Sequence, residues 1–247
     1  MLGKLILCAL VIGLPVSAQS VISTVSGLVY HVEGQAFIND RPVEQQKGRF
    51  VQMREQHTLR TGQGRAEVLL APDIVLRLGE GSAVRLLSEQ VVEPEFRLIS
   101  GSAVLEVSAI PRGELVTIQC GAASVTFGKP GLYRMRAQPA EVLVYDGRAV
   151  VTSGGRRVSL DQGKALSLDG GWETRAELQT KADALDQWTA ARSRILASER
   201  TETGLEARSG QRPASGWVPA SISVPPGSGR RGKRGSDEPD AHARRVE

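Results

Sequence analysis

The stretch Thr58–Leu78, TLRTGQGRAEVLLAPDIVLRL, decides the fold. Its second half holds two short runs separated by Pro72 and Asp73, and in each run apolar residues recur at every second position. These residues are Ala66, Val68 and Leu70 in the first run and Ile74, Leu76 and Leu78 in the second. Such alternation over about four to six residues, bounded by turn-forming residues, is typical of strands with one buried face. We therefore predict two strands on either side of a turn.

The same alternation continues on both sides of this stretch, from Val21 to Leu168. Further runs are Leu28, Tyr30 and Val32; Ala103, Leu105 and Val107; Ala123, Val125 and Phe127; and Tyr133, Met135 and Ala137. A helical period of about 3.6 residues does not compete with this pattern. The class predicted for the middle of the chain is all-β.

A loose repeat of the form Gly-x-Ala marks the approaches to these runs. Its glycines are Gly34, Gly64, Gly81, Gly101, Gly121, Gly147 and Gly163, at intervals of 16 to 30 residues. Residues 81–84 and 101–104 are identical copies, both GSAV. Glycine permits the positive φ that tight turns often require, but a regular solenoid would keep a constant period. We therefore predict a rolled sheet or an irregular β-solenoid of short strands.

The N-terminal segment Met1–Ala18 has the three parts of a secretory signal peptide. Lys4 supplies the charge, an apolar run extends from Leu5 to Leu14, and residues 16–18, VSA, form the cleavage site. This run is about half of the ~20 residues that a membrane-spanning helix requires. We predict a cleaved, exported protein beginning near Gln19, without a stable membrane span. The alternative is an uncleaved signal anchor.

Cysteine and histidine are scarce, with two Cys and three His among 247 residues. Cleavage of the signal would remove Cys8 and leave Cys120 without an intramolecular partner. Cys120 would share a strand face with Val116 and Ile118, so we interpret it as a small buried apolar residue rather than a nucleophile.

Several segments of the β region resemble, in order, the elements of the FecR domain, a bacterial envelope module. The segment Thr58–Leu70 resembles its opening, a Thr-Gly pair, a small polar insert and an Arg-Ala-Glu-apolar strand. The elements that follow are Ile74–Leu78, Gly81–Leu86, Phe96–Ala103 and Glu141–Val150. The match runs from about residue 59 to residue 151, within a FecR-like β domain that we assign to residues 21–172.

The chain departs from the family pattern in three places. Residues 71–74, APDI, replace the usual Asp-Gly turn, and residues 128–133, GKPGLY, replace the usual Gly-Thr before a strand. Family members that control sigma factors carry a cytoplasmic segment and a transmembrane helix ahead of this domain, whereas here it follows a signal peptide directly. The resemblance therefore implies the fold and the periplasmic or secreted location, without the anti-sigma and transmembrane segments.

One amphipathic helix is predicted at Leu178–Ala197. Its apolar residues Leu185, Trp188 and Ile195, with Leu196 less squarely, lie near one face. Asp183 is placed to cap its start, and Arg192 and Arg194 near its end suit the helix dipole. We interpret it as a helix that packs Trp188 on the open end of the β domain; the alternative is a helix that binds a partner.

The last fifty residues, 198–247, change character: nineteen are Gly, Pro or Ser. Such a segment lacks the apolar surface that would offset the entropy of ordering it, so we predict a disordered basic tail. The run Gly227–Arg234 is interpreted as a solvated linker end, with contact to anionic envelope polymers as the alternative. It is not a phosphate-binding loop, because Arg234 stands where Ser or Thr would bind the metal.

Patterns for catalytic, cofactor or metal sites are missing from the sequence. His31, His57 and His242 lack ligand spacing, and a Gly-x-Ser-x-Gly elbow does not occur. We predict a protein that is not an enzyme, without catalytic, cofactor-binding or metal-binding residues, and its binding residues stay unassigned. The enzymatic alternative requires two carboxylates that meet in one cleft.

The remaining interpretations of the function are those of a binding protein. A formal charge of +4 is small for this length and does not require a nucleic-acid partner. The leading interpretation is a non-catalytic exported envelope protein, a FecR-like sensor or scaffold module that binds a protein or polymer. The alternative is a carbohydrate-binding module for cell wall or exopolysaccharide, which would need exposed aromatic faces. We expect most aromatics of the region to face inward: Tyr30, Phe37, Phe50, Phe96, Phe127, Tyr133 and Tyr145, with Trp172 after it.

Overall fold

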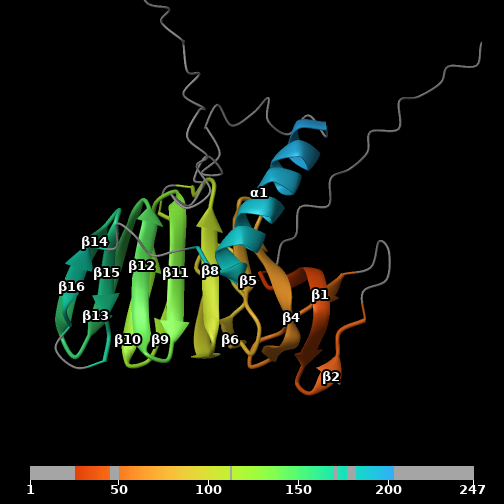
Figure 1. Cartoon of the computed structure of the whole chain (residues 1–247), viewed down its shortest axis with the longest axis horizontal. Coiled ribbons are helices and arrows are strands. Elements are labelled where there is room, and N and C mark those ends of the chain that lie inside the picture. Colours follow the sequence, from red (N-terminus) through yellow and green to blue (C-terminus); the bar gives the residue numbers. More distant parts are fainter. Residues whose placement is uncertain (1–25, 45–49, 112, 170–171, 177–181, 203–247) are drawn as a thin grey trace, which may run out of the picture.

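The structure, a computed structural model, describes residues 26–44, 50–111, 113–169, 172–176 and 182–202 (Figure 1). Within these ranges the chain forms sixteen strands in one sheet and a single helix. The strands are β1 (Leu28–Ile38), β2 (Arg41–Pro42), β3 (Val51–Gln52), β4 (Thr58–Ala71), β5 (Ile74–Leu78), β6 (Ala83–Ser88), β7 (Glu95–Ser100), β8 (Ser102–Val107), β9 (Val116–Cys120), β10 (Ala123–Phe127), β11 (Gly131–Ala137), β12 (Ala140–Asp146), β13 (Arg148–Ser153), β14 (Arg156–Asp161), β15 (Lys164–Ser167) and β16 (Thr174–Ala176). The helix is α1 (Ala184–Glu202). The predicted signal peptide and residues 203–247 of the predicted tail lie outside the described residues.

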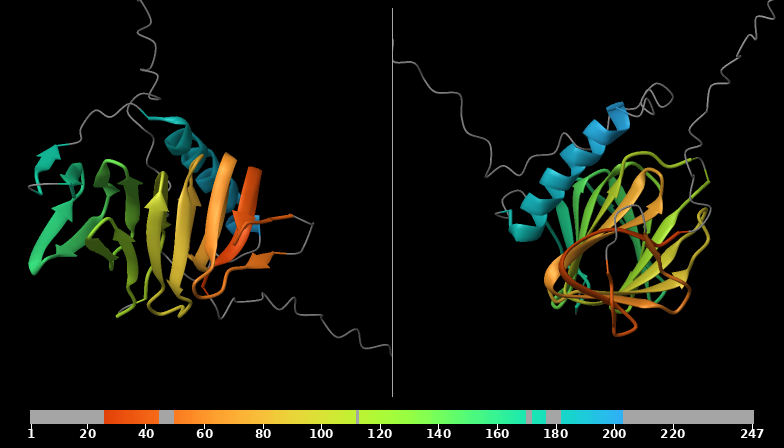
Figure 2. Two further views of the ribbon diagram at one scale, coloured as in Figure 1. Left: turned by 90° about the horizontal axis from the view of Figure 1, so that it is seen from below. Right: turned by 90° about the vertical axis from the view of Figure 1, so that its right-hand side faces the viewer.

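The sheet curls on itself, so that two walls of strands face each other (Figure 2). We call β5, β8, β11, β12, β15 and β16 the helix wall, and β6, β7, β9, β10, β13 and β14 the open wall. The long strand β4 joins the walls, because residues 58–60 pair with β6 and residues 66–71 pair with β5. The predicted all-β class, the rolled sheet and the C-terminal helix are confirmed.

The residues that face inward from both walls form one core. Leu76, Leu78 and Leu105 from the helix wall belong to the same buried cluster as Phe96, Ile118 and Val125 from the open wall. On strands β7, β9 and β10 of the open wall buried residues alternate with half-buried or exposed ones, as the sequence predicts. On β5 and β8 nearly every residue of both faces is buried, which means that the outer faces of these two strands are covered as well.

The two GSAV copies of the loose repeat lie against each other. Ser82 Oγ accepts a hydrogen bond from the Ser102 amide at 2.9 Å and donates one to the Ser102 carbonyl at 3.0 Å. Gly101 has φ of 70°, and a Cβ there would lie 2.6 Å from the Ser82 Cα. Glycine is therefore required for this close approach, and these two copies mark crossings between the walls. Gly121 lies instead in the turn between β9 and β10 within the open wall, so the repeat is not that of a regular solenoid.

Asp183 caps the start of α1, as the sequence predicts. Its Oδ1 accepts hydrogen bonds from the amides of Leu185 at 2.9 Å and Asp186 at 3.1 Å. In return, the Asp183 amide donates to Asp186 Oδ2 at 3.2 Å, so the two aspartates form a reciprocal cap. The helix ends at Glu202, and residues 198–202, expected in the tail, are helical.

The helix does not close the open end of the β domain, contrary to the sequence interpretation. It lies against the outer face of the helix wall, where Trp188 clusters with Val104 and Leu132 at 6% exposure (Figure 1). The prediction that Ile195 shares the buried face is wrong, because this side chain is 44% exposed. The buried face continues instead through polar residues such as Arg192, since the wall beneath it is charged.

The cap makes stability depend on pH. Burial opposes ionisation of Asp183, but the hydrogen bond and charge of Arg134 outweigh it and lower the Asp183 pKa from 3.8 to about 2. Asp183 has a lower pKa in the folded chain than in the unfolded chain, so its carboxylate stabilises the fold above about pH 3.8. This stabilisation is lost as the pH falls toward 2. Burial raises the pKa of Asp186, which acts in the opposite sense, so a variant is needed to isolate Asp183.

We therefore expect Asp183→Asn, which keeps the capping oxygen, to lose stability at neutral pH and to match wild type near pH 2. Denaturant unfolding at several pH values measures the difference. The control is Asp40→Asn, which alters an exposed ion pair with Arg60. A wild-type advantage over the Asp183 variant that stayed constant from neutral pH to pH 2 would contradict the prediction.

Candidate functional site

The outer face of the helix wall is closed by buried charges under α1. Arg77, with no exposed side-chain area, donates to Glu67 at 2.9 Å and to Glu106 at 2.6 Å. From the helix, Arg192 donates to Glu67 at 2.8 Å and Ser193 donates to Glu106. Buried charges that keep all their partners are tolerated, whereas one that loses its partner is costly. We assign this cluster to holding α1 in place.

A second group of polar contacts anchors the start of the helix. Arg134 on β11 forms ion pairs with Asp183 and, at 2.8 Å, with Asp186. Tyr145 on β12 donates to Asp186 at 3.1 Å, and burial raises the pKa of this phenol. The helix wall therefore offers little free surface beneath α1.

Sequence reasoning missed this polar interface. The signal lay in charged residues at outward positions of otherwise apolar strands, Glu67, Arg77 and Glu106. A matching set, Asp186, Thr189, Arg192 and Ser193, recurs at helical spacing. Because the prediction considered only the apolar residues of the helix, it placed Ile195 on the buried face in place of these polar side chains.

The outer face of the open wall carries side chains that solvent reaches. The residues at its outward positions are Arg97, Thr117, Gln119, Ser124, Thr126, Arg148, Val150, Thr152, Arg157 and Ser159, each exposed or half-buried. Gln119 accepts from Arg97 at 2.8 Å and donates to Glu95 at 2.7 Å. The β7 side of this face is therefore occupied by its own hydrogen bonds, which leaves the β10–β13–β14 side as the candidate site.

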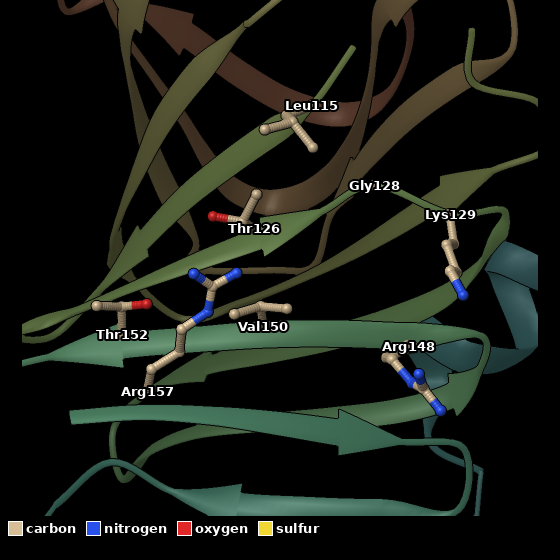
Figure 3. Close-up of a pocket in the computed structure, with 8 residues that line it drawn as sticks. All are labelled: Leu115, Thr126, Gly128, Lys129, Arg148, Val150, Thr152 and Arg157. Carbon is tan, nitrogen blue, oxygen red and sulfur yellow. The ribbon is translucent and has the colours of Figure 1, made fainter. Parts of the chain in front are cut away.

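A hollow of about 340 Å³ lies on that side (Figure 3). It is lined by Leu115, Thr126, Gly128, Lys129, Arg148, Val150, Thr152 and Arg157. Sheet register brings these residues together, since Thr126 pairs with Val150 and Thr152 pairs with Arg157 on neighbouring strands. Lys129 comes from residues 128–130, where the chain departs from the FecR pattern between β10 and β11.

The lining has a one-sided charge, because it contains three cations and no acid. Arg148 donates to Asp161 just outside the lining, and both side chains are more than half exposed, at 51% and 59%. Lys129 and Arg157 make no ion pair within the described part of the chain. Figure 3 shows the Arg157 side chain directed toward Thr126. This arrangement suits a ligand with negative charge and some apolar surface.

The aromatic side chains of the β region differ in how far solvent reaches them. Phe96, Phe127 and Tyr133 are fully buried. Half-buried are Tyr30, Phe37, Tyr145 and Trp172. Phe50 is 48% exposed and stacks on Tyr30 with ring centroids 5.2 Å apart. None of the aromatics contributes to the lining of the hollow.

Cys120 is fully buried, as the sequence predicts. Burial raises its thiol pKa to about 11, and Sγ donates to the Arg136 carbonyl at 3.1 Å. A thiol with a raised pKa in a buried position is a poor nucleophile, so its role is packing. Among the described residues there is no group of three or more metal-ligating side chains. The one helix in the described ranges lacks the run of apolar residues needed to traverse a bilayer.

Comparison with known proteins finds one family model that matches the middle of the chain. Residues 57–151 match the family model described as FecR protein, a range that begins just before β4 and ends within β13. Two crystal structures of a "putative anti-sigma factor" from Parabacteroides distasonis, at 2.50 and 1.65 Å resolution, have TM-scores of 0.42 and identities of 18% and 17%. Each match covers 55% of this chain and 64% of that protein. No curated protein matches.

The family match and the sequence resemblance agree almost to the residue, 57–151 against 59–151. Within the match lie the strand β4 that joins the walls and both GSAV copies. Outside it lie β14 and α1, and therefore Arg157 and the residues that cover the helix wall. Residues 57–151 of this chain are therefore similar to the FecR protein family.

Proposed function

We propose that this protein is a non-catalytic, exported envelope protein, a FecR-like sensor or scaffold module. It binds its partner through the outer face of the open wall. The observation that carries the proposal is the difference between the walls, because α1 packs on the outer face of one wall over β8 and β11. The outer face of the other wall presents a hollow in which Lys129 and Arg157 make no ion pair within the described residues. Export to the periplasm or beyond is supported by the signal-peptide pattern of residues 1–18.

A carbohydrate-binding module is the second candidate function. The observation that favours it is the stacked pair Tyr30 and Phe50, the latter half exposed. Exposed aromatic faces are the usual platform for sugar rings. A single pair at the β1 end is a small platform, so this candidate ranks below the open wall.

Photo-crosslinking in the native envelope tests the proposal. A photoreactive amino acid is placed at Thr152 or at Ser159 on the open wall, or at Arg194 on the solvent face of α1 as the control. We expect adducts of higher mass from the open-wall positions and none from the control. A further position at Phe50 reports on the carbohydrate candidate. Adducts from Arg194 alone, or none from the open wall, would overturn the proposal.

A further inference from the structure

The spacing of the cations in the hollow defines a pattern that a ligand would have to match. Arg148 and Thr152 lie four residues apart on β13, and Arg157 pairs with Thr152. At about 3.3 Å per residue, the two arginine backbones are thus separated by roughly 13 Å along the strand direction. Val150 lies halfway between them on the same face.

The side chains of an extended peptide are spaced by the same distance. Its alternate side chains point to one side, so residues i and i+4 are separated by roughly 13 Å, with residue i+2 between them. Acidic residues at i and i+4 would face the cationic ends of the hollow, Arg148 with Lys129 at one end and Arg157 at the other. An aliphatic residue at i+2 would meet Val150 and Leu115.

We propose that the hollow on the open wall binds an extended acidic segment of a protein partner, with the pattern acid-x-aliphatic-x-acid. Arginine and lysine ends give charge-assisted hydrogen bonds to carboxylates, and the Thr126 and Thr152 hydroxyls can bond peptide groups. The exposed Arg148–Asp161 pair contributes little to stability, so a ligand carboxylate can take the place of Asp161.

A protein segment fits this hollow better than an acidic polysaccharide does. Sugar rings pack on aromatic faces, and the lining has none. It has instead the aliphatic side chains of Leu115 and Val150, of which Leu115 is 39% exposed. This inference rests on the proposed function, since it names the partner class for the same face.

Selection from a random twelve-residue peptide library on the mature protein, residues 19–247, tests the inference. We expect peptides with acid-x-aliphatic-x-acid to be enriched at least tenfold over the starting library. The double variant Lys129→Glu/Arg157→Glu should lose this enrichment. The matched variant Lys164→Glu/Arg194→Glu reverses two exposed cations elsewhere and should retain it. Equal melting temperatures of the three proteins show that all are folded.

The outcomes separate this inference from the proposed function. No enrichment of the pattern, or enrichment that survives on the Lys129/Arg157 variant, overturns the inference. Polygalacturonate serves as the polysaccharide probe; if it binds wild type but not that variant while the peptides fail, the ligand is a polysaccharide and the inference is wrong. In either case crosslinks from Thr152 would still support the open wall as the binding face.

Discussion

Replacing Trp188 with alanine is expected to lower the free energy of unfolding by about 3–5 kcal/mol, the usual range for a buried tryptophan. Trp188 is 6% exposed and packs with Leu185 on the helix wall. Its Nε1 donates to Glu33 at 2.7 Å, and the Arg65 guanidinium lies 5.9 Å from its ring centroid. The variant therefore loses apolar contacts and leaves Glu33 without a hydrogen bond that joins β1 to α1.

The matched control is Ile195→Ala on the same helix, where the side chain is 44% exposed. It should change stability by no more than about 0.5 kcal/mol. Urea unfolding of both variants gives the comparison. If Trp188→Ala behaved like Ile195→Ala, α1 would not be packed on the wall, and the helix would have to be reconsidered as a free partner-binding element.

Replacing Arg77 with methionine is expected to lower the free energy of unfolding by about 3–5 kcal/mol, although methionine is apolar and of similar length. Arg77 neutralises both Glu67 and Glu106 in a position without solvent. Without it, Glu67 keeps Arg192, but among the described residues Glu106 keeps only the hydroxyl of Ser193. A buried carboxylate with an incomplete set of partners accounts for the expected loss.

Arg97→Met on the open wall is the control for this change, because Arg97 is exposed and hydrogen-bonds to the neutral Gln119. The free energy of unfolding of this variant should stay within about 0.5 kcal/mol of that of wild type. Denaturant midpoints with unchanged slopes would show that both variants unfold in the same way as wild type. Equal stabilities of the Arg77 and Arg97 variants would contradict a structural role for the buried cluster.

The strands were predictable from the sequence because each depends on local alternation. Ala66, Val68 and Leu70 read as one buried face, and all three are at most 1% exposed. The Asp183 cap was equally local. The assignment of strands to walls was not predictable, because pairs such as β5 with β8 join segments far apart in the sequence.

The candidate site was less accessible to sequence reasoning than the fold. Its lining comes from residues 115–129, 148–152 and 157, which only the pairing of β10, β13 and β14 brings together. Each of its cations, read alone, resembles an ordinary surface charge. Trp188 was correctly expected to be buried, but its place was wrong because the charged outer face of the helix wall was not foreseen.

The alternation of the chain between the walls has a consequence for how the molecule unfolds. After β4, the chain supplies β5 to one wall, β6 and β7 to the other, β8 to the first, and continues so to β16. Neither wall is a continuous piece of sequence, so neither can separate from the other while remaining intact. The domain should lose structure in a single cooperative transition, and folding should be slow for its size because most pairings are non-local.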